Sequence, residues 1–265
     1  MKKILYLLSA AVLSVMFSGS VWAQENDVKP LPDDPRVKTG KLANGLTYYV
    51  FRNTAVKGYA DFAVANKAGT TLEKNNQKGM GKMLELLSTR GTRNFTDSTI
   101  VEYLNSLGVT SDDIIFNTGA DEIIYTIENV PVGRENTVDS TLLILYNWMA
   151  SINVDEEDVA RTMPMLKKTL MDQLGAGARI EDGIMKELYP KSPYAKSITP
   201  DQINGLKTYS SKELRNFYYK WFRPDLQAVF VVGDVDLNKV ETQIKSIFAT
   251  IPTKNHRKRT VTNVF

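Results

Sequence analysis

The spacing of apolar residues divides the chain into segments of two kinds. Short segments rich in β-branched and aromatic residues predict strands, here residues 46–51, 59–65, 122–130 and 226–232. Asn44-Gly45 is a strong turn pair directly before the first of them. Residues 41–51 therefore predict a β-hairpin.

Segments in which apolar residues recur every three or four positions predict helices. The clearest begins at Gly79, where Met80, Met83, Leu84 and Leu87 share one face. Similar patterns predict helices at 98–107, 136–151, 155–174, 210–223 and 236–248, and a short helix that begins at Thr199-Pro200. Because Pro164 lies inside the 155–174 segment, we expect that helix to kink or split.

Strands and helices come in blocks along the chain rather than in strict alternation. This order favours an α+β fold in which an antiparallel sheet is covered by helices. Six residues on the apolar faces are expected to form one core: Leu84, Leu87, Leu142, Trp148, Val231 and Phe248.

The amino-terminal residues 1–23 have the pattern of a signal peptide. A basic start precedes the apolar run Ile4–Phe17, and Val21-Trp22-Ala23 fits a signal peptidase site before Gln24. We expect a periplasmic or secreted protein, cleaved near Ala23. The run is too short to span a bilayer comfortably, and no later segment predicts a transmembrane helix. Polar, proline-bearing residues 24–40 predict a linker.

Charge and cysteine content narrow the possible chemistry. Without Lys2 and Lys3 of the leader, the 33 basic residues fall to 31, against 30 acidic residues. The small remaining excess of basic residues lies in the tail, residues 254–265. We interpret this tail as a solvated terminal run, so nucleic acid is not an expected partner. The chain has no cysteine, which excludes disulfides and thiolate metal sites.

Seven short motifs occur in the order seen in one peptidase family. They are Leu42-x-Asn44-Gly45-Leu46, Ala68-Gly69-Thr70-x-x-Glu73, Gly91-Thr92-x-Asn94-Phe95, Asn129-Val130-Pro131, Ser192-Pro193-Tyr194, the segment 217–225 and the segment 231–236. In this order they resemble the insulinase/pitrilysin family of zinc peptidases. The resemblance implies one α+β half of a clamshell, the normally catalytic amino-terminal half, over residues 41–253, with segments of about 41–190 and 191–253.

The family's zinc motif is only partly present. The resemblance places His-x-x-Glu-His, two zinc ligands and a general base on one helix, at Lys82-Met83-Leu84-Glu85-Leu86. Glu85 occupies the base position, but Lys82 and Leu86 occupy the ligand positions. A lysine ammonium has no lone pair to donate, and leucine has no donor atom. We therefore expect Glu85 to be idle in catalysis and to pair with Lys82 or Lys78 as an exposed helical residue.

The third zinc ligand of the family, a glutamate, corresponds to Thr169, and a shift of register could offer only Asp172. The single histidine of the chain, His256, lies in the basic tail. Catalytic zinc sites use imidazole or thiolate ligands. We therefore expect no metal and no other cofactor, although zinc is the cofactor that the resemblance implies.

The resemblance also implies that peptides lie along an exposed sheet edge. The matching strand follows Asn117-Thr118-Gly119-Ala120, which makes Asn117 a candidate peptide contact. Alternatively, Asn117 only starts a turn into the strand 122–130.

These observations leave three interpretations of function. The first is an exported, inactive family member that binds a peptide or unfolded segment, or completes a chamber as a homodimer or with a zinc-bearing homologue or second half. The second is a metal-dependent endopeptidase with an unorthodox site. The third is a truncated family remnant.

Overall fold

The structure is a computed structural model that describes residues 34–96, 99–195 and 198–253. The predicted signal peptide, most of the predicted linker and the basic tail lie outside these residues. From Pro35 onward the described residues belong to one compact unit.

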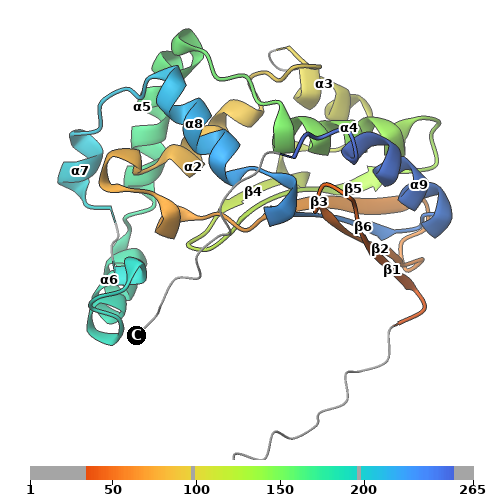
Figure 1. Ribbon diagram of the computed structural model, residues 1–265, viewed down its shortest axis with the longest axis horizontal. Helices are drawn as coiled ribbons and strands as arrows, with labels where there is room; N and C mark the ends of the chain where they lie inside the picture. Colours follow the sequence, from red (N-terminus) through yellow and green to blue (C-terminus); the bar gives the residue numbers. More distant parts are fainter. Residues whose placement is uncertain (1–33, 97–98, 196–197, 254–265) are drawn as a thin grey trace, which may run out of the picture. The chain divides into compact units, whose positions relative to one another are not determined.

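One mixed sheet organises this unit (Figure 1). Its strands are β1 (Val37–Lys41), β2 (Thr47–Arg52), β3 (Tyr59–Asn66), β4 (Ile114–Thr118), β5 (Ile123–Pro131) and β6 (Gln227–Gly233). Their order is β1-β2-β6-β3-β5-β4. All neighbours are antiparallel except β2 and β6, which are parallel.

The α+β class is confirmed, but the expectation of a purely antiparallel sheet is wrong at one pair. β6 is the last strand of the unit in sequence, and it lies between β2 and β3 near the middle of the sheet. The apolar pattern of a strand determines which side chains are buried, and it does not specify the direction of the neighbouring strand.

The predicted hairpin forms between β1 and β2. Its turn is closed by hydrogen bonds from the Leu42 N–H to the Leu46 carbonyl, 2.8 Å, and from the Gly45 N–H to the Leu42 carbonyl, 2.9 Å. Gly45 has a φ of +92°, a left-handed conformation that favours glycine. The predicted linker is four residues too long, because residues 37–40 pair with β2.

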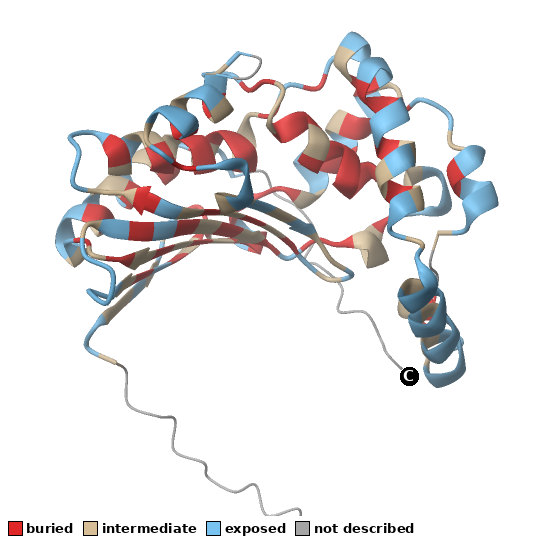
Figure 2. Ribbon diagram, turned by 180° about the vertical axis from the view of Figure 1, so that it is seen from behind, coloured by how far each residue is buried: buried red, intermediate tan, exposed pale blue. Residues whose placement is uncertain are grey.

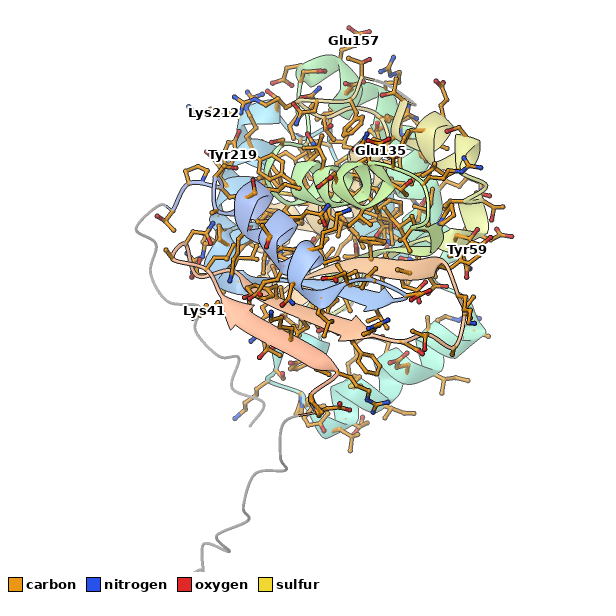
Figure 3. All side chains as sticks on the ribbon, turned by 90° about the vertical axis from the view of Figure 1, so that its right-hand side faces the viewer. Lys41, Tyr59, Glu135, Glu157, Lys212 and Tyr219 are labelled. Carbon is orange, nitrogen blue, oxygen red and sulfur yellow. The ribbon has the colours of Figure 1, made fainter. Side chains whose placement is uncertain are left out.

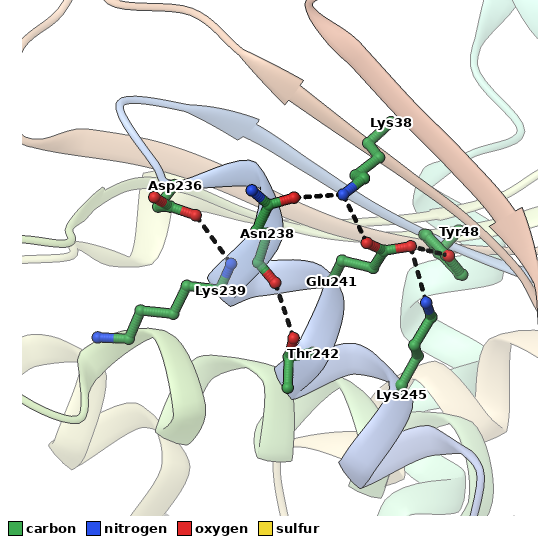
Figure 4. Close-up of polar contacts among 8 residues, drawn as sticks. All are labelled: Lys38, Tyr48, Asp236, Asn238, Lys239, Glu241, Thr242 and Lys245. Atoms are coloured by element: carbon green, nitrogen blue, oxygen red, sulfur yellow. Dashed lines mark hydrogen bonds and ion pairs between the residues drawn. The ribbon is translucent and has the colours of Figure 1, made fainter.

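A cluster of charged side chains fastens the edge strand β1 to helix α9 (Leu237–Phe248). Lys38 contacts the Glu241 carboxylate at 2.7 Å, the Tyr48 hydroxyl donates to it at 2.6 Å, and Lys245 lies 2.9 Å from it (Figure 4). The bonds from Lys38, Tyr48 and Lys245 lower the pKa of Glu241 to about 2. This cluster supports the first strand of the sheet.

Most of the α-helices lie over one face of the sheet, while α6 lies apart from it (Figure 1). The α-helices are α2 (Met80–Ser88), α3 (Thr99–Ser106), α4 (Thr137–Ala150), α5 (Glu156–Asp172), α6 (Ala176–Leu188), α7 (Pro200–Asn204), α8 (Ser211–Trp221) and α9. Short 3₁₀ helices are η1 (Thr70–Leu72), η2 (Asn75–Gln77), η3 (Ser111–Asp113), η4 (Pro193–Ala195) and η5 (Pro224–Leu226).

Three local features differ from the sequence expectations. Helix α5 runs continuously through Pro164, so the expected split does not occur. Pro164 lies on the exposed side, while Met163 and Leu166 beside it are buried and hold the helix against its neighbours. Strand β4 and helix α6 were not predicted as elements. The residues of β4 do not alternate between apolar and polar, whereas α6 has apolar residues four apart, at Ile180, Ile184 and Leu188, a pattern typical of a helix.

The core lies between the helices and the sheet (Figures 2 and 3). All six residues expected to share one core belong to a single buried cluster. Trp148 is fully buried, and its indole N–H donates to the Ser88 carbonyl at 3.1 Å. Its ring packs edge-on against Tyr125 and Phe116, at 5.7 Å and 5.1 Å between centroids.

We predict that Trp148→Ala lowers the free energy of unfolding by about 3–5 kcal/mol, because it removes a fully buried aromatic side chain and leaves a cavity. Urea denaturation measures the change. The control Ile180→Ala removes an apolar side chain that is 66% exposed on α6, and should change the stability by no more than about 0.5 kcal/mol. Equal effects of the two substitutions would contradict the packing described above.

Candidate functional site

Helix α2 carries the degenerate zinc motif, and a buried carboxylate fixes its first turn. Gly79 precedes the helix with a φ of +84°. The Glu73 carboxylate accepts hydrogen bonds from the backbone N–H groups of Gly79, at 2.9 Å, and Gly81, at 2.8 Å. These donors have no partner within the helix, and the helix dipole favours a negative charge at this end. Glu73 therefore acts as the cap of α2.

Two loops bring the rest of the site to α2. The N–H groups of Thr70 and Thr71 donate to the carbonyls of Gly119 and Ala120, each at 3.0 Å. This pairing joins the loop before Glu73 to the loop after β4. At Gly81 an added Cβ would lie 3.3 Å from both Glu73 Oε1 and Thr118 Cγ2, so a glycine there lets the helix approach closely.

The candidate base Glu85 is buried, and both of its carboxylate oxygens accept hydrogen bonds. The Lys82 Nζ donates to Glu85 Oε1 at 2.8 Å and to Oε2 at 2.6 Å, and the Thr118 hydroxyl donates to Oε2 at 2.6 Å. Lys82 and Glu85 are only 7% and 9% exposed. The predicted pairing with Lys82 is confirmed, whereas the expected exposure of Glu85 is wrong, because α2 packs against α5 and β4 as well as α8.

The other two degenerate ligand positions lie in apolar or mixed surroundings. Leu86 is half-buried and packs against the core. Thr169 is half-buried on α5. Leu170 of α5 and Gln173, the residue directly after this helix, line a cavity of about 140 Å³ that Lys82 also lines. Asp172, the alternative ligand, instead pairs with Lys168 at 2.5 Å on an exposed surface.

These residues do not fit a catalytic zinc ion. Zinc sites are built from imidazole, thiolate and carboxylate ligands. Here an ammonium group occupies both oxygens of the only carboxylate in the motif, and Leu86 offers no donor atom. In residues 34–96, 99–195 and 198–253 no cluster of three or more histidine, cysteine, aspartate or glutamate side chains has the arrangement of a metal site.

Asn117 lies within the edge strand itself rather than before it. It belongs to β4, which pairs with β5 on one side and is the last strand of the sheet. The strand 122–130, expected to form the edge, is the interior strand β5. The turn interpretation of Asn117 is therefore wrong. Asn117 and Ile115 are both exposed on β4.

Sequence reasoning gave no role to Glu73, Thr118 or Gln173. Glu73 is only 8% exposed, and burial raises its pKa to about 7, while the bonds from Gly81 and Gly79 and the charge of Lys78 oppose this shift. Glu73 is part of the motif Ala68-Gly69-Thr70-x-x-Glu73, which marks it as a residue of interest. Its role as a cap was not evident, because six residues separate it from the start of α2. Burial, and after it the charge of Glu85, also raises the pKa of Tyr125.

The layered α+β unit and the helix with its partial motif define the class as a zinc-peptidase-like half-domain. The family model described as "Insulinase (Peptidase family M16)" matches residues 48–201, and the model "Peptidase M16 inactive domain" matches residues 208–264. The chain belongs to the insulinase family, peptidase family M16.

Relatives within the family are much longer than this chain. "Probable zinc protease PqqL" of Haemophilus influenzae is 28% identical over 81% of the chain, which corresponds to 23% of that protein. "Zinc protease PQQL-like" of Arabidopsis thaliana is 29% identical over 84% of the chain and 23% of that protein. The chain thus spans less than a quarter of the length of these relatives.

Solved structures of similar proteins show the same fold. The first half of the periplasmic protease PqqL from Escherichia coli superposes with a TM-score of 0.80 at 21% identity, over 89% of this chain and 50% of that one. Pitrilysin gives a TM-score of 0.71 at 16% identity, over 91% of this chain and 25% of that one. No helix in the described part of our chain is long and apolar enough to cross a membrane.

The buried Glu73 predicts a pH-dependent stability. Its pKa is about 7 in the folded protein against 4.5 for the free group, so the folded state binds more protons than the unfolded state between these values. Stability is therefore lost as the pH rises from about 4.5 to 7. Relative to Glu73→Gln, the wild type should lose up to about 3 kcal/mol between pH 4.5 and pH 8.

Urea denaturation at several pH values measures this difference. The amide can accept only one of the two backbone N–H bonds, which adds a constant offset, so the slope with pH is the informative quantity. Glu181→Gln, a change of an exposed carboxylate on α6, is the matched control and should leave the slope unchanged. The same slope in wild type and Glu73→Gln would contradict the prediction.

Proposed function

We propose that this protein is an exported, non-catalytic member of the insulinase family that binds extended peptide segments and works with a partner. The observation that carries the proposal is the buried pair of Lys82 and Glu85. A general base needs a free lone pair within reach of the water that it activates. Both oxygens of the Glu85 carboxylate accept a hydrogen bond from the Lys82 ammonium, and Oε2 also accepts one from the Thr118 hydroxyl, so the carboxylate is paired with a cation and not directed at a water.

Peptide binding is supported by the exposed edge of β4. An edge strand has backbone N–H and C=O groups that can pair with an added strand, and this pairing needs no metal. The side chains of Ile115 and Asn117 are exposed on β4 and alternate with half-buried neighbours. An extended peptide could therefore pair with the backbone and contact both side chains.

A partner is supported by the length of the relatives. The chain matches less than a quarter of the PqqL-type proteins. We propose that the partner is a second copy of this chain, a zinc-bearing homologue or a second half of the family's kind. Export is supported by the signal-peptide pattern of residues 1–23 and by the periplasmic location stated for Escherichia coli PqqL.

If peptides bind along β4, a substitution on its exposed edge should weaken peptide binding. Ile115→Lys places a charge on the exposed edge, where lysine opposes pairing with another strand. We expect it to weaken the binding of a fluorescent, unstructured peptide at least about tenfold, or about 1.4 kcal/mol, in an anisotropy titration. The control Met165→Lys changes another exposed apolar residue, on α5, and should leave binding unchanged. Equal affinity for wild type and Ile115→Lys would exclude β4 as the binding edge.

Repair of the motif tests the assignment of the ligand positions. The purified wild type should retain well below one zinc per chain after dialysis. Lys82→His and Leu86→His place two imidazoles four residues apart on one helix, and Thr169→Glu adds a third ligand. This triple variant should bind zinc at least about tenfold more tightly than the wild type, which corresponds to about 1.4 kcal/mol, but cleave unstructured peptides little or not at all.

A second triple variant checks the register on α5. It combines the same two histidines with Gln173→Glu, since Gln173 lines the cavity beside Lys82. Zinc affinity in this variant alone would assign the third position to Gln173. Wild-type affinity in both folded variants would show that Lys82 and Leu86 do not occupy ligand positions. Tight stoichiometric zinc in the wild type itself would overturn the non-catalytic proposal.

A further inference from the structure

The cavity beside α2 is lined by two buried side chains of opposite charge. Glu73 reaches it from the loop before the helix, and Lys82 reaches it from the helix. Both are more than nine-tenths buried. Burial of a charge is costly unless the charge is paired or hydrogen-bonded. The hydrogen bonds that Glu73 and Lys82 already make therefore show which further hydrogen bonds a ligand in the cavity could form with them.

Lys82 retains capacity to donate. A lysine ammonium has three N–H donors. Within the described residues its two hydrogen bonds both go to the Glu85 carboxylate. One N–H of Nζ therefore remains for an acceptor on the cavity side. The charge of Lys82 is already balanced by Glu85. The remaining donor therefore favours an acceptor in a molecule that is neutral overall, such as a carboxylate with a positive group close by.

Glu73 retains capacity to accept. Each of its oxygens accepts one backbone N–H, from Gly79 or Gly81, and each oxygen has a further lone pair. Its bonding partners are neutral amides, and the opposite charge that acts on it is that of Lys78, which also lines the cavity. A cationic donor in the cavity would supply the opposite charge that the neutral amides lack, next to a carboxylate side chain that is only 8% exposed.

The size and remaining lining of the cavity restrict the ligand further. A volume of about 140 Å³ is enough for several water molecules or one small organic ligand. Thr70, Thr118 and Gln173 supply further polar groups, while Leu170 and Ile198 supply an apolar wall. A small polar molecule with a short apolar group matches this lining.

We propose that this cavity binds a free α-amino acid with a short side chain, with its carboxylate on Lys82 and its ammonium group on Glu73. A simple carboxylate would leave the negative Glu73 facing an anion, and a simple amine would leave the Lys82 donor facing a cation. The zwitterion satisfies both groups. This site adjoins the end of β4 at Thr118, and it needs neither a peptide nor a partner subunit.

Isothermal titration of the wild-type protein with three probes tests the proposal. The probes are L-alanine, acetate and methylammonium, at matched ionic strength and pH 8, above the pKa of Glu73. L-alanine should bind saturably with a Kd in the millimolar range or below, and the two single ions at least tenfold more weakly. No L-alanine binding up to about 50 mM, or acetate or methylammonium binding as tightly as L-alanine, would overturn the proposal.

Substitutions assign the two contacts. Glu73→Gln should weaken L-alanine binding at least tenfold. The contact with Lys82 is tested with two variants. Glu85→Gln keeps the lysine, and Lys82→Gln/Glu85→Gln removes both charges together. The double variant should bind L-alanine at least tenfold more weakly than the single variant. Asp172→Asn, an exposed carboxylate next to Gln173, is the control and should bind like wild type.

Unchanged affinity in Glu73→Gln, or equal affinity in the two glutamine variants at position 85, would place the ligand elsewhere and contradict the site. Circular dichroism checks that each variant is folded. The comparison of the three probes uses only the wild-type protein, so it decides the question even where a variant fails to fold.

Discussion

The site depends on the neutralisation of charge on a helix that is almost entirely buried. Helix α2 packs between the sheet and the helices α5 and α8, and it carries Lys82 and Glu85 one turn apart on its inner side. Removing one member of a buried ion pair typically costs about 3–5 kcal/mol, because the other charge is left without a partner. Lys82 and Glu85 therefore each stabilise the burial of the other, and Thr118 donates a further hydrogen bond to the carboxylate.

A large part of this arrangement could be predicted from local sequence. The period of Met80, Met83, Leu84 and Leu87 predicted the buried face of α2, and Asn44-Gly45 predicted the first hairpin. The lack of ligand atoms at Lys82 and Leu86 follows from the chemistry of the residues alone. These predictions succeed because they depend on neighbours within one turn of helix or one strand, and the pattern of the chain records such neighbours directly.

The rest depends on contacts between distant segments. The burial of Glu85 requires Thr118 from β4, a strand whose sequence alternates too weakly to be recognised. The parallel pairing of β2 with β6 joins strands separated by most of the chain, and Pro164 is tolerated within α5 because its neighbours Met163 and Leu166 are held by the core. The cap that Glu73 provides spans six to eight residues and needs the turn at Gly79. None of these has a local signal.

The presence of Glu85 is therefore weak evidence for catalysis. In a zinc site the same carboxylate would act beside two imidazoles, and here it neutralises an ammonium whose hydrogen bonds within the described residues both go to it. With Lys82 in place, an apolar residue at position 85 would bury an unpaired cation, so the glutamate has a structural role independent of any reaction. Glu73 differs in this respect, because it caps α2 by accepting only neutral N–H donors and retains a charge that the helix does not fully compensate. The chemistry still open to this site thus lies with Glu73 and with the one remaining donor of Lys82, rather than with the residue that the family motif singles out.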